Sequence, residues 1–155
     1  MSERLMHPAA TGFTAEGTHL LHARVYYEDT DAGGVVYHAN YLRFAERGRT
    51  EYLRDSGVTQ SELAEEEGIF FVVRRSEIDF HLPARLDDTL EIRTVIADLK
   101  GASFLVEQRI SKMDAERPLV KVWSTIACVD RQGRPVRVPL SVKSKLDRHV
   151  GGESR

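Results

Sequence analysis

The chain has 155 residues, of which 41% are hydrophobic and 30% charged, as expected for one globular domain rather than a disordered chain. The 22 Lys and Arg against 24 Asp and Glu give a net charge of -2, which argues against binding nucleic acid or anionic lipid through bulk positive charge. Cys128 is the single cysteine, and no Cys/His pair has the spacing of a zinc site. The first twenty residues lack a signal-peptide run, and Ile69 to Val73 is too short to span a bilayer, so we expect a cytoplasmic protein.

The amino-terminal part of the chain has no clear periodicity until the first strand. Residues 1–18 mix Pro, Gly, Ala, Thr and charged residues, and we expect a flexible arm there. Residues 22–27 predict a short strand. We expect a single domain over 19–148 and a flexible tail over 149–155.

A long amphipathic helix is predicted over residues 38–56. Apolar or small residues recur there at steps of four and three, at Tyr41, Ala45, Gly48 and Tyr52. Gly48 lowers helix propensity by about 1 kcal/mol relative to Ala, which indicates that another backbone passes close by. Gly57 supplies a stop for this helix.

A second, shorter helix and then a sheet follow. Thr59 and Glu62 have the spacing of a capping box, which predicts a helix ending at Gly68. The period then changes to two, as in β-strands, over segments 69–82, 88–99, 102–113 and 119–130. In the second of these, Leu90 and Ile92 share one face and Glu91 and Arg93 the other, as in a strand with one wet side. Their short connections leave no room for crossover helices, so an antiparallel meander is expected, with a last short helix over 139–148.

This order of elements predicts an α+β domain in which a curved antiparallel sheet wraps the long helix. One helix cannot cover the whole sheet, and the sheet has edges. We therefore expect two copies to associate through an edge strand.

Chemically reactive groups gather where the long helix begins. Asp31 precedes Gly33 and Gly34, and His38 follows seven positions after Asp31. The glycines permit backbone conformations that a side chain resists, so both side chains can face one small substrate. The helix start also offers unpaired N–H groups that suit an oxyanion.

Structural interpretations of the same residues remain open at this point. Asp29, Thr30 and Asp31 are also typical turn and cap residues. His38 equally suits a hydrogen bond to a neighbouring carbonyl or carboxylate, and Tyr37 and Tyr41 are more typical of a core than of a catalytic site.

The run YYEDTDAGGVVYHANYLRFAERGRTEYLRDSG (26–57) resembles the signature of the acyl-CoA thioesterases of the 4-hydroxybenzoyl-CoA thioesterase family, in its Tol-Pal-associated, YbgC-type branch. The stretches FFVVRRSEIDFHLPARLDDTLEIRT (70–94) and GASFLVEQRI (101–110) also resemble that branch, so the similarity covers about residues 22–146. It implies a hotdog fold, with a five-stranded antiparallel sheet wrapped around one long central helix. It also implies a homodimer or homotetramer with active sites at the subunit interface, and no metal or other cofactor.

The resemblance implies a role for individual residues. The catalytic carboxylate falls on Asp31, and the other active-site positions fall on His38 and Tyr27. The implied substrate-binding residues are Gly34, Val35, Val36, Tyr37, Lys100 and Ser103. Asp31 would activate a water or attack the thioester carbonyl, while backbone N–H groups around Val35 to His38 hold the oxyanion.

Hydrolysis of acyl-CoA to free acid and CoA is therefore the expected function, and two alternatives stay open. A hotdog hydratase or dehydratase also uses a carboxylate and a histidine but leaves the thioester intact. A non-hydrolytic partner of acyl-CoA or acyl carrier protein in envelope lipid metabolism is the other. The acyl group itself, whether short, long or aromatic, is not predicted by the sequence.

Overall fold

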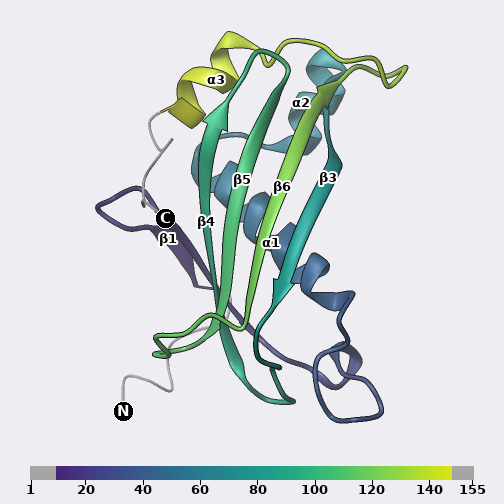
Figure 1. The fold of residues 1–155 in the computed structure, drawn as a ribbon. Helices are drawn as coiled ribbons and strands as arrows, with labels where there is room; N and C mark the ends of the chain where they lie inside the picture. Colours follow the sequence, from purple (N-terminus) through teal and green to yellow (C-terminus); the bar gives the residue numbers. More distant parts are fainter. Residues whose placement is uncertain (1–9, 148–155) are drawn as a thin grey trace.

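The computed structural model describes residues 10–147 and folds them into one antiparallel sheet with helices packed against it (Figure 1). The helices are α1 (Asn40–Asp55), α2 (Gln60–Glu67) and α3 (Leu140–Asp147). The strands are β1 (Thr11–Phe13), β2 (His19–Arg24), β3 (Phe70–Phe80), β4 (Thr89–Leu99), β5 (Ser103–Lys112) and β6 (Val120–Val129). Their order across the sheet is β1-β2-β4-β5-β6-β3. Within this part of the chain, no helix is long and apolar enough to cross a membrane.

The predicted α+β class is confirmed, as are the three helices and the four long strands, each within a few residues of its expected bounds. The predicted four-strand meander is wrong: β4, β5 and β6 are consecutive neighbours, but β3 pairs with β6 at the far edge rather than with β4. The predicted number of strands is wrong, because the sheet has six strands rather than five. The capping box is not formed: Thr59 is the N-cap residue of α2, but its side chain makes no capping hydrogen bond. The two helix stops are confirmed, since Gly57 and Gly68 both have positive φ, at 93° and 66°.

The sixth strand comes from the segment expected to be a flexible arm. Residues 11–13 form β1, which pairs with β2 in the register Thr11 to Leu21. Phe13 packs edge-on against Tyr52 of α1, with ring centroids 5.0 Å apart. A strand of three residues is too short to show a period of two, which explains why the sequence pattern missed it. Residues 1–9 of the expected arm, and the expected tail 149–155, lie outside the described residues.

Helix α1 lies behind the sheet in Figure 1 and comes very close to it at Gly48. A Cβ atom at this position would lie 2.6 Å from Ile92 Cγ2 and 2.8 Å from Gln108 Nε2. The close approach expected from the sequence is therefore real, but the neighbours are side chains of β4 and β5 rather than a backbone. The face predicted to be buried does contact the core, through Tyr41, Phe44, Ala45, Gly48 and Tyr52.

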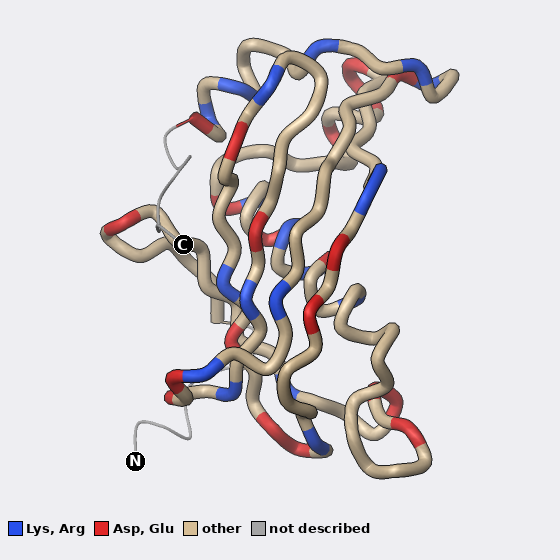
Figure 2. The backbone as a smooth tube through the Cα atoms, viewed as in Figure 1, with Lys and Arg blue, Asp and Glu red and all other residues tan. Residues whose placement is uncertain are grey.

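The two faces of the sheet differ in chemistry. On β4, Leu90 and Ile92 are fully buried, while Glu91 and Arg93 between them are partly exposed, as the alternation predicted. Three basic residues of the outer face follow one another across neighbouring strands, because Arg93 is paired with Arg109 and Arg109 with Lys121 (Figure 2). This face is charged, whereas the inner face carries the hydrophobic core.

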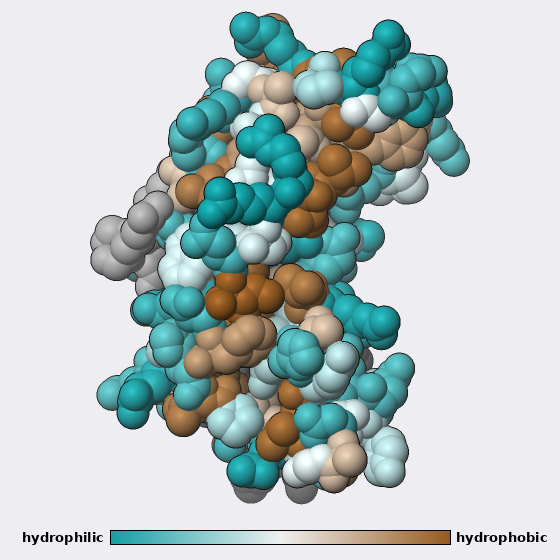
Figure 3. Space-filling model, turned by 45° about the vertical axis from the view of Figure 1, so that its right-hand side comes forward, coloured by the Kyte–Doolittle hydropathy of each residue, from teal (hydrophilic) through white to brown (hydrophobic). Residues whose placement is uncertain are grey.

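Strand β3 forms an exposed edge that is rich in apolar residues. It pairs with β6 on one side, and its other side has no neighbouring strand in the described part of the chain. Phe70, Val72, Val73 and Phe80 are 40% to 52% exposed. Figure 3, in which the β3 side is turned forward, shows patches of hydrophobic side chains on this side of the molecule. A long apolar edge strand is a ready surface for pairing with another chain.

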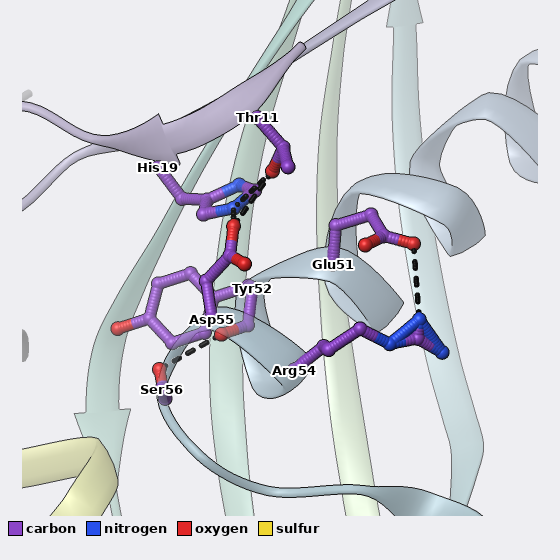
Figure 4. Close-up of polar contacts among 7 residues, drawn as sticks. All are labelled: Thr11, His19, Glu51, Tyr52, Arg54, Asp55 and Ser56. Atoms are coloured by element: carbon purple, nitrogen blue, oxygen red, sulfur yellow. Dashed lines mark hydrogen bonds and ion pairs between the residues drawn. The ribbon is translucent and has the colours of Figure 1, made fainter. Parts of the chain in front are cut away.

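The short strands β1 and β2 are fastened to the end of α1 by a buried histidine (Figure 4). His19 Nε2 lies 2.8 Å from Asp55 Oδ2, and the hydroxyl of Thr11 donates to the same oxygen at 2.7 Å. His19 is 0% exposed, and its Nδ1 has no hydrogen-bond partner in the described structure. Burial lowers the pKa of His19, because the charged imidazolium loses its hydration, despite the opposing hydrogen bond and charge of Asp55.

Substitution of Gly48 by Ala tests the close approach of α1 to the sheet. The added methyl group overlaps Ile92 and Gln108, so we expect Gly48→Ala to lower the free energy of unfolding by about 1–3 kcal/mol. Gly12→Ala is the matched control, because a Cβ at Gly12 meets nothing within 4 Å. Urea unfolding of both variants measures the difference, and equal stability of the two would contradict this packing.

His19 should also make stability depend on pH. In the unfolded chain His19 takes up a proton near pH 6.5, whereas its pKa in the folded protein is lower. The unfolded state therefore binds more protons as the pH falls below about 6.5, and the free energy of unfolding should fall with it. In His19→Gln, the difference in stability between pH 7 and pH 5.5 should be smaller than in the native protein. An unchanged pH dependence in this variant would contradict the role given to His19.

Candidate active site

The segment before α1 forms a small hairpin loop with Asp31 at its tip. Thr30 forms a β-bridge with Val36, and the Asp31 N–H donates to the Val35 carbonyl at 2.9 Å. The turn is closed by the Gly34 N–H, which donates to the Asp31 carbonyl at 3.0 Å. Gly34 has a φ of 80°, which explains why a glycine stands here.

The Asp31 carboxylate is exposed and is oriented by its own loop. The Gly33 N–H donates to Asp31 Oδ1 at 2.8 Å. A Cβ atom at position 33 would lie 3.2 Å from the same oxygen. The φ of Gly33 is not positive, so this position does not need the backbone freedom of glycine. Glycine suits it because the Asp31 carboxylate lies very close to where a side chain would begin.

Asp29 holds this loop against the start of α1. It is 5% exposed, and its Oδ1 accepts a hydrogen bond from Asn40 Nδ2 at 2.8 Å. Its Oδ2 accepts the Tyr26 N–H at 2.8 Å, and its carbonyl accepts the Tyr37 N–H at 2.9 Å. The interpretation of Asp29 as a turn residue that satisfies backbone donors is confirmed. Its partner Asn40 was not singled out from the sequence.

A second anchor joins the loop to the segment before β4. The Tyr41 hydroxyl accepts the Ala84 N–H at 3.0 Å, and the Ala84 carbonyl accepts the Val36 N–H at 2.8 Å. Tyr41 is 3% exposed, and burial raises its pKa, so it acts as a neutral hydrogen-bonding group. The core role expected for Tyr41 is confirmed, whereas Tyr37 is 50% exposed and does not belong to the core.

The two other residues that the resemblance assigned to catalysis are also exposed. The His38 ring packs against Tyr37, with centroids 4.6 Å apart, and against the edge of Phe80 at 6.4 Å. Tyr27 is 83% exposed. In residues 10–147 the Asp31 carboxylate accepts a hydrogen bond from Gly33 alone, so Tyr27 does not hold it within one chain. The contact between His38 and Phe80 of β3 was not foreseen.

Some of the backbone N–H groups near the start of α1 already donate hydrogen bonds within the protein. The N–H groups of Val36 and Tyr37 donate to carbonyls of the protein and are not free for a substrate. Those of Val35 and His38 have no acceptor among the described residues. The helix itself begins at Asn40, two residues later than expected, so these free donors belong to the turn that leads into it.

The expected substrate residues Lys100 and Ser103 lie at the far end of the sheet. Both stand at the β4–β5 turn, where the Lys100 N–H donates to the Ser103 carbonyl. The Asp31 loop lies beside the segment that leads into the opposite end of β4, because Val35 forms a β-bridge with Arg85 and the Val36 N–H donates to the Ala84 carbonyl. An 11-residue strand spans about 35 Å, so these groups do not meet within one chain.

A cavity of about 70 Å³ lies between α1, α2 and the first half of β3. Exposed Glu46, Val72 and Val73 form its outer rim. Its inner lining is mainly apolar and includes Leu53, Phe71, Ile96, Phe104, Val106 and Ile126. Neither Asp31 nor His38 of the same chain lines it.

Comparisons with a family model, with curated relatives and with solved structures all match this chain to thioesterases. Residues 25–146 match the model of the thioesterase-like superfamily. An acyl-CoA thioesterase YbgC of Haemophilus influenzae is 51% identical over 122 residues, which are 78% of this chain and 88% of that protein. The crystal structure of a probable thioesterase from Bartonella henselae is 49% identical, with a TM-score of 0.74, and covers 79% of this chain and 99% of that chain.

A more distant structure shows the fold alone. It is a 4-hydroxybenzoyl-CoA thioesterase in complex with 4-hydroxybenzoyl-CoA, 20% identical, with a TM-score of 0.78, covering 84% of this chain and 99% of that one. The sheet and helices described above thus have the hotdog arrangement of these thioesterases. The match over residues 25–146 and the high identity to the YbgC relative lead to one conclusion: this chain belongs to the thioesterase-like superfamily.

Proposed function

We propose that the protein hydrolyses acyl-CoA thioesters to a free acid and CoA. The single observation that carries this proposal is the exposed Asp31 carboxylate, fixed by Gly33 at the tip of a loop that is anchored to α1. The names of the YbgC relatives, an acyl-CoA thioesterase and an acyl-CoA thioester hydrolase, support the same reaction class.

The chemistry needs an ionised carboxylate next to the thioester. Asp31 either takes a proton from a water molecule that attacks the carbonyl carbon, or attacks that carbon itself to give a mixed anhydride that water then hydrolyses. In both routes the carbon–sulfur bond breaks, and the CoA thiolate leaves and takes up a proton. We assign stabilisation of the oxyanion to the N–H groups of Val35 and His38, which have no acceptor among the described residues, each worth about 3–4 kcal/mol. The His38 ring orients the water or the carbonyl.

Two copies paired along β3 would complete the site. β3 is an exposed apolar edge, and antiparallel pairing over its whole length places Phe80 of one subunit beside the first residues of the partner's β3. His38 packs on Phe80, so it comes close to the end of the partner's cavity that Phe71 lines. The same symmetry brings the partner's β4–β5 turn to the end of the molecule that carries Asp31. Lys100 and Ser103 of that turn would then meet the CoA moiety across the dimer, or in a dimer of such dimers.

Replacement of Asp31 tests the proposed reaction. Asp31→Asn keeps the acceptor for the Gly33 N–H but removes the charge, so we expect kcat for acyl-CoA hydrolysis to fall by about 10²-fold or more. Asp114→Asn is the control, an exposed turn aspartate with φ of 63° that Asn tolerates. Thiol release measures both variants. An acyl-CoA that is bound but never cleaved by the native protein would favour the acyl-binding partner instead.

The anchor between Asp29 and Asn40 should be a positioning device for Asp31. In Asn40→Asp two carboxylates face each other, so we expect about a 10-fold or larger loss of kcat. Asp29→Asn should be milder, because the Asn40 amide can turn and pair with it. When both substitutions are combined, the amide at position 29 accepts from Tyr26 and donates to the carboxylate at position 40, so kcat should return towards the native value. A double variant no better than Asn40→Asp would rule out this pairing as the cause.

A further inference from the structure

A groove of about 310 Å³ lies on the outer face of the sheet, where the hairpin between β5 and β6 stands beside β4 and β5. Its floor is formed by Glu91, Arg93, Arg109 and Ser111. These residues lie on the face of the sheet that points away from α1, and Asp31 does not line the groove. The groove is therefore separate from the candidate active site.

The wall of the groove is held in place by the backbone of the hairpin. The Met113 N–H donates to the Thr89 carbonyl of β4 at 2.9 Å, and the Ala115 N–H donates to the Lys112 carbonyl at 3.1 Å. Figure 1 shows the hairpin bending towards β4 instead of continuing the line of β5 and β6. Three hairpin residues line the groove on this side: Ala115, Glu116 and Pro118. The shape of the groove is thus fixed by hydrogen-bonded backbone.

The floor belongs to a row of positive charges that the described residues neutralise only in part (Figure 2). Arg93 Nε donates to Glu91 Oε1 at 3.0 Å. Arg109 stands directly opposite Arg93 on one side and Lys121 on the other, and the row ends at Asp79 of β3. Within residues 10–147, Arg109 and Lys121 have no ion-pair partner. Like charges directly opposite one another destabilise a sheet, so an anion bound to this row would stabilise the protein.

The carboxylates near the row restrict which anion fits. Glu91 already accepts from Arg93, while Glu116 on the wall is exposed. A long polyanion such as a nucleic acid would run from Arg109 onto Glu116 and be repelled there. A single phosphate group fits on Arg109 alone, because the planar guanidinium can donate two parallel N–H groups to two phosphate oxygens.

The volume leaves room for more than one phosphate group. At about 10–15 Å³ for each water-sized group, a groove of about 310 Å³ holds roughly 20–30 of them. A phosphate group takes up about five of these, and the rest accommodates a body of the size of a sugar or a nucleoside. The Ser111 hydroxyl and the Glu116 carboxylate line the groove and can form hydrogen bonds with hydroxyl groups of such a body.

We propose that this groove binds a compact phosphate monoester, with the phosphate group on the Arg109 guanidinium and the remainder of the molecule between Ser111 and the hairpin wall. The Arg93 charge is shared with Glu91 and makes a weaker contribution. The inference does not depend on the proposed hydrolysis. It adds a second ligand site on the opposite face of the sheet from α1.

Titration calorimetry of the native protein with a matched pair of small molecules tests the need for phosphate. Ribose 5-phosphate should bind with a Kd below about 1 mM, whereas ribose should bind at least about tenfold more weakly. Linear polyphosphate, compared at equal phosphate concentration, should bind no more tightly than ribose 5-phosphate. Equal affinity for ribose and its phosphate, or tighter binding of polyphosphate, would overturn the proposal.

Two neighbouring cations of the row provide matched variants. Arg109 lines the groove and Lys121 does not, although both carry the same charge. Arg109→Gln should weaken the binding of ribose 5-phosphate at least about tenfold, and Lys121→Gln should change it by less than about twofold. The Tm of Arg109→Gln should not fall, because the substitution removes one of three like charges. Equal losses of affinity in both variants would show a general effect of positive charge and contradict the site.

A third variant and a spectroscopic readout locate the bound phosphate. Lys100 follows the last residue of β4, whereas the groove lies near the first residues of that strand. Lys100→Gln should therefore leave the affinity for ribose 5-phosphate unchanged. In the NMR spectrum of the native protein, ribose 5-phosphate should shift the amide signals of Arg109 and Ser111 and not those of Val35 and His38. Loss of binding in Lys100→Gln, or shifts confined to Val35 and His38, would overturn the proposal.

Discussion

The close contact of α1 with the sheet at Gly48 is the constraint on which the rest of the structure depends. Any side chain there would meet Ile92 and Gln108, so the missing Cβ allows the helix to lie directly on the inner strands. The side-chain amide of Gln108 donates to the Ala45 carbonyl and to the Thr94 hydroxyl, so this buried amide is hydrogen-bonded next to the helix. The contact at Gly48 sets how close the helix lies to the sheet, and separate hydrogen bonds hold its two ends.

The two ends of α1 hold different parts of the molecule. At the amino-terminal end, Asn40 and Tyr41 hold the loop that carries Asp31, through Asp29 and Ala84. At the carboxyl-terminal end, Asp55 holds β1 and β2 through His19 and Thr11. The Asp31 loop is thus positioned by buried hydrogen bonds, whereas its carboxylate stays exposed to a substrate. A rigid support with an open reactive group is what catalysis by preorganisation needs.

Much of this architecture could be predicted from the sequence, because long periodic segments carry strong signals. The small and aromatic residues of the 38–56 segment indicated the buried face of α1, and the alternation of Glu91 and Arg93 with Leu90 and Ile92 indicated the wet and dry faces of β4. β1 was missed because three residues carry no periodic signal. The pairing of Asp29 with Asn40 was missed because a buried side-chain contact across a turn leaves no pattern. The separation of Lys100 from Asp31 follows from the strand length, which is why the proposed site draws on a second subunit.

The central claim, that the loop-held Asp31 carboxylate acts on the thioester, is tested most directly by a crystal structure of the Asp31→Asn protein with an acyl-CoA. We expect the thioester carbonyl beside residue 31 and the N–H groups of Val35 and His38. A thioester bound away from residue 31 would contradict the claim.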